Sequence, residues 1–239
     1  MSYKINFFGH AAFSISGNGQ EIYIDPWIQN PKCPEPFTDL SKHHPTAILL
    51  THGHNDHFGN TIDLLKQNPS AKLYAIFDLI DLVSAVPGVA PEQLVGLNKG
   101  GTVAIGGGFT ATFVTALHSS TYDGKFAGEA GAWIIHTPDG KHTIYHTGDT
   151  DVFGDMRIIN DLWQPDIAMV CIGDHFTMGP KSAAYAIAEL MPSLKTVIPM
   201  HYGTFPALTG TPEKLEEFLR ERKSQTKVNA VAPGAFTEL

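Results

Sequence analysis

Residues 51–57 read Thr51-His52-Gly53-His54-Asn55-Asp56-His57, which brings three imidazoles and one carboxylate into six consecutive positions. The segment follows an apolar run at residues 47–51 that is typical of a buried strand. A strand end holds its side chains rigidly, and the next loop can turn several of them toward one point. Imidazole and carboxylate suit zinc, manganese, iron or nickel. Because shuffled chains of this composition would show the pattern only about once or twice per thousand, it predicts a metal site.

Strand-like and helix-like patterns extend from this segment to both ends of the chain. Strands are predicted at residues 4–8, 12–16, 21–25, 47–51, 72–76, around 103, 110–117, 133–136, 143–146, 167–172 and 196–199. Helices are predicted at residues 60–67, 78–85, 181–189 and 212–222. Hairpin strands followed by strand–helix units occur twice, with no low-complexity linker between them. The pattern indicates an α/β fold in one domain, residues 1–239, with two sheets face to face and helices outside.

The composition excludes several classes of function. The formal net charge of -8 repels phosphate backbones, so extended nucleic-acid binding is disfavoured. No apolar stretch approaches the roughly 20 residues that cross a bilayer, and the N-terminal residues do not resemble a secretory signal. The two cysteines, Cys33 and Cys171, form no CxxC pair and are interpreted as reduced thiols. We therefore expect a cytoplasmic protein with a small-molecule substrate; a homo-oligomer is compatible with the sequence.

The segment 52–57 resembles the HxHxDH signature of the metallo-β-lactamase superfamily. The remaining ligand positions of that superfamily are filled in order: His118 after the predicted strand 110–117, Asp149 within Gly148-Asp149-Thr150, and His201 after the strand 196–199. The resemblance covers essentially the whole chain. It implies a four-layer αββα sandwich of two mixed sheets.

Three further segments resemble one branch of this superfamily. They are Gly9-His10-Ala11-Ala12-Phe13, Ile24-Asp25-Pro26-Trp27 and residues 172–180. The branch is that of the compact metal-dependent hydrolases. It is related to ascorbate-6-phosphate lactonases and to phospholipases D that act on N-acyl phosphatidylethanolamine.

The resemblance implies a site for two divalent metal ions, with zinc favoured over manganese, iron and nickel. The first ion would be bound by His52, His54 and His118, the second by Asp56, His57 and His201, with Asp149 bridging them. A metal-bridging hydroxide would attack a carbonyl or phosphoryl centre of a lactone, ester, amide or phosphodiester. Asp56 would also orient the hydroxide or take up a proton.

Several other residues are candidates for the site. Asp25 either accepts the second N–H of a ligand histidine or starts the turn at Pro26. His10 is a catalytic or site-lining candidate, with a structural role as the alternative. His175 is a candidate for protonating the leaving group, although its loop can also serve only to start the next helix. The residues beside His201 that touch substrate or wall the pocket are Tyr202, Thr204 and Phe205.

The other histidines are interpreted as structural or solvent-exposed. His43 and His44 precede Pro45 in a loop, where solvation is expected. A structural role is expected for His136, His142 and His146, on or near a predicted hairpin. The mixed charges of residues 212–222 indicate a solvated outer helix face.

Two alternatives to a hydrolase stay open. The same fold with a single iron can oxidise sulfur compounds, and a non-catalytic metal-binding module would use the same ligands without turnover. The complete set of seven ligand positions favours two metals and hydrolysis. A tRNA-processing nuclease is disfavoured, because the chain is short and acidic.

Overall fold

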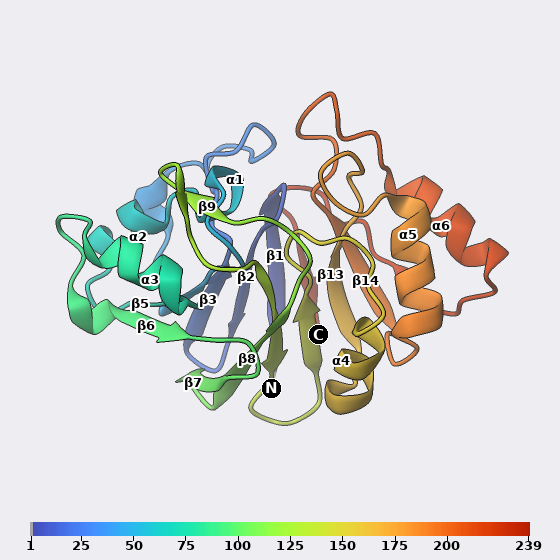
Figure 1. Ribbon diagram of the computed structural model, residues 1–239, viewed down its shortest axis with the longest axis horizontal. Helices are drawn as coiled ribbons and strands as arrows, with labels where there is room; N and C mark the ends of the chain where they lie inside the picture. Colours follow the sequence, from blue (N-terminus) through green and yellow to red (C-terminus); the bar gives the residue numbers. More distant parts are fainter. Residues whose placement is uncertain (1) are drawn as a thin grey trace.

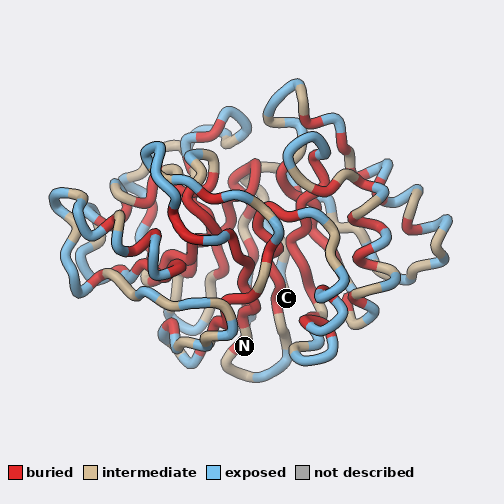
Figure 2. The backbone as a smooth tube through the Cα atoms, viewed as in Figure 1, coloured by how far each residue is buried: buried red, intermediate tan, exposed pale blue. Residues whose placement is uncertain are grey.

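The computed structural model describes residues 2–239 and contains two seven-stranded sheets at its centre. Helices α2 and α3 lie outside one sheet, and α4, α5 and α6 lie outside the other (Figure 1). Buried residues follow the central strands, whereas exposed residues concentrate on the helices and loops (Figure 2). The predicted arrangement of two mixed sheets with helices outside is confirmed.

The first sheet has the strand order β16-β1-β2-β3-β4-β5-β6. Its strands are β1 (Lys4–Gly9), β2 (Ala12–Gly17), β3 (Gln20–Ile24), β4 (Ala47–Leu49), β5 (Lys72–Ile76), β6 (Leu94–Leu97) and β16 (Phe236–Glu238). The pairs from β16 to β3 are antiparallel, and those from β3 to β6 are parallel. The connections of its parallel half contain α1 (Asn55–Phe58), α2 (Thr61–Gln67) and α3 (Phe77–Ser84), with short 3-10 turns at Leu40–Lys42 and Pro91–Gln93.

The second sheet has the order β15-β14-β13-β12-β11-β8-β7 and repeats this plan. Its strands are β7 (Thr102–Gly106), β8 (Phe109–Thr115), β11 (Gly131–His136), β12 (Thr143–His146), β13 (Ile167–Cys171), β14 (Thr196–Met200) and β15 (Lys227–Val228). The strands from β12 to β15 are parallel. The outer helices are α4 (Met156–Trp163), α5 (Pro180–Tyr185), continued by a π-helical turn at Ala186–Leu190, and α6 (Pro212–Glu221). A small separate hairpin pairs β9 (Thr121–Tyr122) with β10 (Lys125–Phe126).

The two sheets are tied together at the end where β4 finishes. The indole Nε1 of Trp133, fully buried on β11, donates to the carbonyl of Leu50 at 3.0 Å. The backbone N–H of Gly131 donates to the carbonyl of Thr51 at 3.0 Å. These bonds satisfy backbone groups that would otherwise be buried without partners, which is costly. They hold the loop after β4 against the second sheet, where β12, β13 and β14 also end.

The helix α4 and the strand β6 were not anticipated from the sequence. In α4, Met156 and Ile159 are buried, whereas Ile158 and Leu162 are 55% and 68% exposed. The helix has only 8 residues, and its N-cap residue Asp155 forms no side-chain cap hydrogen bond, so neither a long apolar period nor a capping motif marks it in the sequence. The predicted helix at residues 181–189 is divided into the α-helical α5 and the π-helical turn after it.

The prediction that His43 is solvent-exposed is wrong. Its side chain is buried, with Nδ1 2.7 Å from the hydroxyl of Tyr23 and Nε2 2.6 Å from the carbonyl of Phe37. The loop that precedes it folds back over β3 and supplies the second partner. Such long-range contacts leave no local signal in the sequence. His44, in contrast, is exposed as expected.

The charges of α6 face solvent as expected, while Leu215 and Leu219 on its other face are buried. Across residues 2–239, none of the helices has the length and apolar character required to cross a membrane.

Candidate metal centre

The histidine-rich segment leaves the first sheet after β4 and enters the short helix α1. His52 and His57 are fully buried, whereas His54 and Asp56 are partly exposed. Glycine is required between the first two histidines, because a Cβ on Gly53 would lie 2.8 Å from the carbonyl oxygen of Thr121. The backbone therefore runs close to the β9–β10 hairpin and turns alternate side chains inward.

The structure brings the seven ligand positions expected from the sequence together. Potential ligand atoms lie within 4.8 Å of one another in three overlapping groups: His52, His54 and His118; His52, His57 and Asp149; and His10, Asp56, His57 and His201. His118 follows β8, Asp149 follows β12 and His201 follows β14. Strand ends from both sheets therefore supply one connected cluster that can hold metal.

Asp149 lies between the groups. Its Oδ1 is 3.1 Å from His57 Nε2, and its Oδ2 is 3.1 Å from His201 Nε2 and 3.6 Å from His118 Nε2. The carboxylate thus contacts histidines of both sets. This is the arrangement expected of a residue that bridges two cations.

Unpaired buried atoms show that the cluster fits a metal. Among residues 2–239, no group forms an aligned hydrogen bond with the buried atoms His57 Nε2, Asp149 Oδ1 and His201 Nε2. Leaving such a group unsatisfied costs about 1–3 kcal/mol each, so a native site with several of them requires an explanation. Imidazole nitrogens and carboxylate oxygens that converge without aligned hydrogen bonds match the donor set of a zinc-type cation, which the imidazoles bind in their deprotonated form.

The two histidine sets differ in their electrostatics. Burial lowers the pKa values of His52, His54 and His118, so that these three are neutral at pH 7. In the other set burial also opposes protonation, but Asp149 and Asp56 outweigh it and raise the pKa of His201 to about 9. Asp149 and Asp25 likewise raise the pKa of His57 well above its usual value. Without metal, the second set therefore carries protons that the first set lacks.

Asp25 and Thr51 orient two of the histidines. The Oδ2 atom of Asp25 accepts from His57 Nδ1 at 2.7 Å and from the Thr51 hydroxyl at 2.7 Å. Because the Thr51 hydrogen is used in this way, its oxygen accepts from His52 Nδ1, 2.9 Å away. In both imidazoles the hydrogen-bonded nitrogen is Nδ1, so Nε2 is turned toward the cluster. Hydrogen bonds to the second ring nitrogen commonly fix the tautomer of a metal-binding histidine in this way. The alternative that Asp25 serves only the turn at Pro26 does not account for these contacts.

His10 and Thr204 also meet at the cluster. His10 is buried, with Nε2 3.0 Å from Asp56 Oδ2 and Nδ1 2.9 Å from the Thr204 hydroxyl. Burial lowers the pKa of His10 to about 4. The ring of Phe205, 37% exposed, lies 5.6 Å from the His10 ring. Tyr202 is partly buried beside His201.

His175 is the predicted site residue that lies apart. It is exposed on the loop after β13, and its ring packs against that of Phe176 at 4.4 Å. Within residues 2–239, no hydrogen bond or ring contact joins its side chain to the cluster.

Two residues that support the site were not singled out from the sequence for this role. The position of Thr51, directly before His52, is a sequence signal that could have identified it. His146, expected to be structural, is fully buried. Its Nδ1 accepts a hydrogen bond from the backbone N–H of Gly148 at 3.2 Å, and its Nε2 donates to the carbonyl of Ala11 at 3.2 Å. It therefore supports the turn that carries Asp149.

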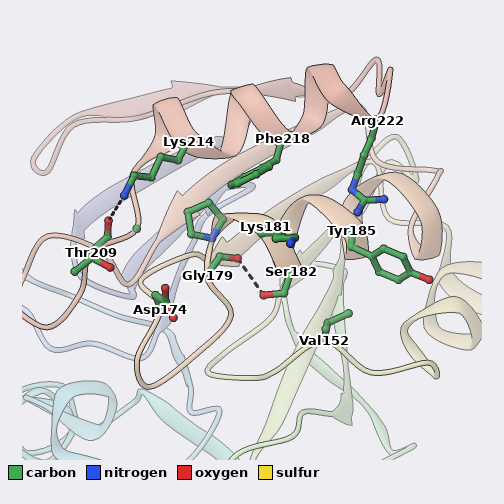
Figure 3. A pocket seen from close by; sticks show the side chains of 12 residues that line it. Val152, Asp174, Gly179, Lys181, Ser182, Tyr185, Thr209, Lys214, Phe218 and Arg222 are labelled. Atoms are coloured by element: carbon green, nitrogen blue, oxygen red, sulfur yellow. Dashed lines mark hydrogen bonds between the residues drawn. The ribbon is translucent and has the colours of Figure 1, made fainter.

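One large cavity lies away from the cluster. About 670 Å³ in volume, it lies along α5 and α6 with Val152 and Asp174 on its far side, and none of its lining residues is a predicted ligand (Figure 3). A cavity of about 450 Å³ does reach the cluster, through His54. It is lined by His54, Asn55, Thr121, Tyr122, Asp123 and Gly124.

Comparison with known proteins agrees with this geometry. The model of the β-lactamase superfamily domain matches residues 20–202. A metal-dependent hydrolase of Chloroflexus aurantiacus is 43% identical over 96% of this chain and 95% of its own. One from Thermodesulfovibrio yellowstonii is 42% identical over 99% of this chain and 92% of its own. The solved structure of a metallo hydrolase from Ignicoccus hospitalis, 31% identical, superposes with a TM-score of 0.86 over 100% of this chain and 99% of its own. The chain therefore belongs to the metal-dependent hydrolases of the metallo-β-lactamase superfamily.

Proposed function

We propose that this protein hydrolyses a lactone, ester, amide or phosphodiester bond of a small molecule, using two divalent cations, with zinc favoured. His52, His54 and His118 would bind one cation, and Asp56, His57 and His201 the other, with Asp149 shared. The observation that carries the proposal is the convergence of histidine nitrogens from both sets on Asp149, several of them buried without an aligned hydrogen bond. In a site for a single metal, Asp149 would not need to contact both histidine sets.

When bound, such a cation pair lowers the pKa of a shared water and polarises the carbonyl or phosphoryl oxygen of the substrate. The protein supplies the positions. Thr51 and Asp25 keep the Nε2 atoms of His52 and His57 directed at the cluster. The Oδ2 atom of Asp56 accepts a hydrogen bond from His10 Nε2. Its other carboxylate oxygen, Oδ1, accepts none from residues 2–239. We propose Oδ1 as the atom that accepts a proton from an attacking water.

The cavity beside His54 supports entry of a small, polar substrate. Its walls present the side chains of Asn55, Thr121 and Asp123. On the opposite side of the cluster, Phe205 stacks near Trp27, with ring centroids 6.1 Å apart, and contacts His10. Tyr202 and Phe205 are proposed as apolar walls. Polar groups of the substrate would then lie toward the hairpin and apolar groups toward Phe205.

Metal content measured by elemental mass spectrometry on the purified protein tests the proposal first. We expect about two equivalents of zinc or manganese per chain, together with turnover in a panel of lactones, esters, amides and phosphodiesters. About one equivalent of iron, with oxidation of a sulfur compound in place of hydrolysis, would overturn it. Metal binding without turnover of any panel member would favour a non-catalytic module.

We also propose His175 as the proton donor to the leaving group, with its loop moving toward the cluster when substrate binds. We expect His175→Ala to lower kcat about a hundredfold, the scale of lost general-acid catalysis, with the metal content unchanged. His44→Ala, which removes another exposed loop histidine, is the control. An unchanged kcat would remove His175 from the mechanism, and loss of one metal equivalent would make it a ligand.

A further inference from the structure

His10 lies outside the seven ligand positions but contacts two residues of the second set, Asp56 and His201. It comes from the start of the chain, between β1 and β2, where the pairing of these strands shifts register at Phe7 and Gly9. Its backbone has a φ of 56°, in the left-handed region that residues with a Cβ rarely adopt. Strain of this kind persists only where the surroundings determine it, and it concentrates at functional sites.

The side chain of His10 forms a directed chain of hydrogen bonds. Because a carboxylate can only accept, the proton of the neutral ring lies on Nε2 and is donated to Asp56 Oδ2, 3.0 Å away. The other nitrogen, Nδ1, is then an acceptor, and the Thr204 hydroxyl donates to it at 2.9 Å. Asp56 thus selects the ring tautomer, and the Thr204 hydroxyl is the partner that satisfies the remaining nitrogen.

The backbone of His10 holds a second ligand position. Its carbonyl accepts from the N–H of His201 at 2.7 Å, and the two rings lie 4.0 Å apart between centroids. His201 itself has a φ of 58°. The strained turns at residues 10 and 201, one from each sheet, therefore support each other across the cluster.

We infer that His10 and Thr204 form a clamp that positions Asp56 and His201 for the second cation, with Thr204 acting through His10 rather than on the substrate. The inference rests on the proposed role of Asp56 and His201 as ligands. It makes His10 a positioning residue, because both of its ring nitrogens are already engaged by protein groups. Under this inference Thr204 acts on His10, whereas the sequence led us to expect that it touches substrate or walls the pocket.

Cation binding to the metal-free protein tests the clamp independently of turnover. Zinc titrated against a chromophoric chelator should show two equivalents on the unchanged protein. We expect His10→Ala to weaken binding of one equivalent 10- to 100-fold, the usual effect of losing an outer partner of a ligand, and to leave the other unchanged. Thr204→Val should weaken binding of the same zinc equivalent. His10→Gln, whose amide can donate to Asp56, should bind that equivalent more tightly than His10→Ala does.

The decisive comparison is the double variant His10→Ala/Thr204→Val. If Thr204 acts through His10, the double variant should bind zinc as His10→Ala does; additive losses would overturn the relay. His10 would instead be a direct ligand if His10→Ala and His10→Gln both lost one zinc equivalent completely while Thr204→Val bound zinc as the unchanged protein does. His43→Gln is the matched control, because it alters an equally buried, doubly bonded histidine without contact to the cluster. Failure of the unchanged protein to bind two equivalents would reject the proposed function and not the clamp alone.

Discussion

Uptake of the second cation is expected to release protons, and uptake of the first is not. His52, His54 and His118 have lowered pKa values and are already neutral at pH 7. The pKa of His201 is raised to about 9, and that of His57 is also raised well above the ordinary value. Both histidines are therefore protonated at pH 7 and must lose their protons to bind a cation. The carboxylates Asp56 and Asp149 have lowered pKa values and contribute no proton.

The direction of the pH effect follows from these values. The affinity of the second set should rise with pH by about tenfold per unit for each displaced proton, until the pH passes about 9 for His201. The first set should be nearly independent of pH above about 6.5. In the metal-free protein the charged His201 stabilises the fold fully below the unfolded histidine pKa of about 6.5, and this contribution is lost as the pH rises through about 9.

Isothermal titration calorimetry with zinc at about pH 7, in buffers with different ionisation enthalpies, measures the released protons directly. We expect one equivalent to bind with about two protons released and the other with none. Release of equal numbers at both equivalents would contradict the division of the cluster into two electrostatically different sets.

Replacement of Asp149 by asparagine is expected to produce the largest loss of activity. Asparagine keeps the shape of the side chain but removes the charge that faces His57, His118 and His201. One metal equivalent should be lost, and kcat/KM should fall on the order of a thousandfold, because a catalytic cation contributes several kcal/mol to the transition state. Elemental mass spectrometry and a hydrolysis assay on the same preparation measure both quantities.

The same variant should change the proton release. Without the carboxylate charge, the pKa values of His57 and His201 return toward their ordinary range, so zinc should displace fewer protons. The matched control is Asp166→Asn, which alters another aspartate paired with a histidine, His142, at the start of β13. It should retain both metals. Full metal content in Asp149→Asn would rule out the bridging role.

The fold and the cluster of candidate ligands are readable from the sequence because their signals are local. His52, His54, Asp56 and His57 stand within one short segment, and His118, Asp149 and His201 each follow an apolar run that forms a strand. Parallel strands place their carboxyl ends at one edge of a sheet, so residues at successive strand ends meet without further information. Short elements without a capping motif, such as α4, carried no comparable signal.

What orients the ligands depends on the tertiary structure. The bond from Thr204 to His10 joins residues 194 positions apart, and that from His10 to Asp56 spans 46. Two buried histidines differ in charge: the pKa of His52 is lowered and that of His201 is raised. The difference arises because protonation depends on which charges face the buried ring. His43 was misassigned for the same reason, since Tyr23 and Phe37 reach it only in the folded chain. Residue type and strand position thus indicated a candidate metal site from the sequence alone, whereas hydrogen-bond partners, tautomers and charge states were decided only by contacts made on folding.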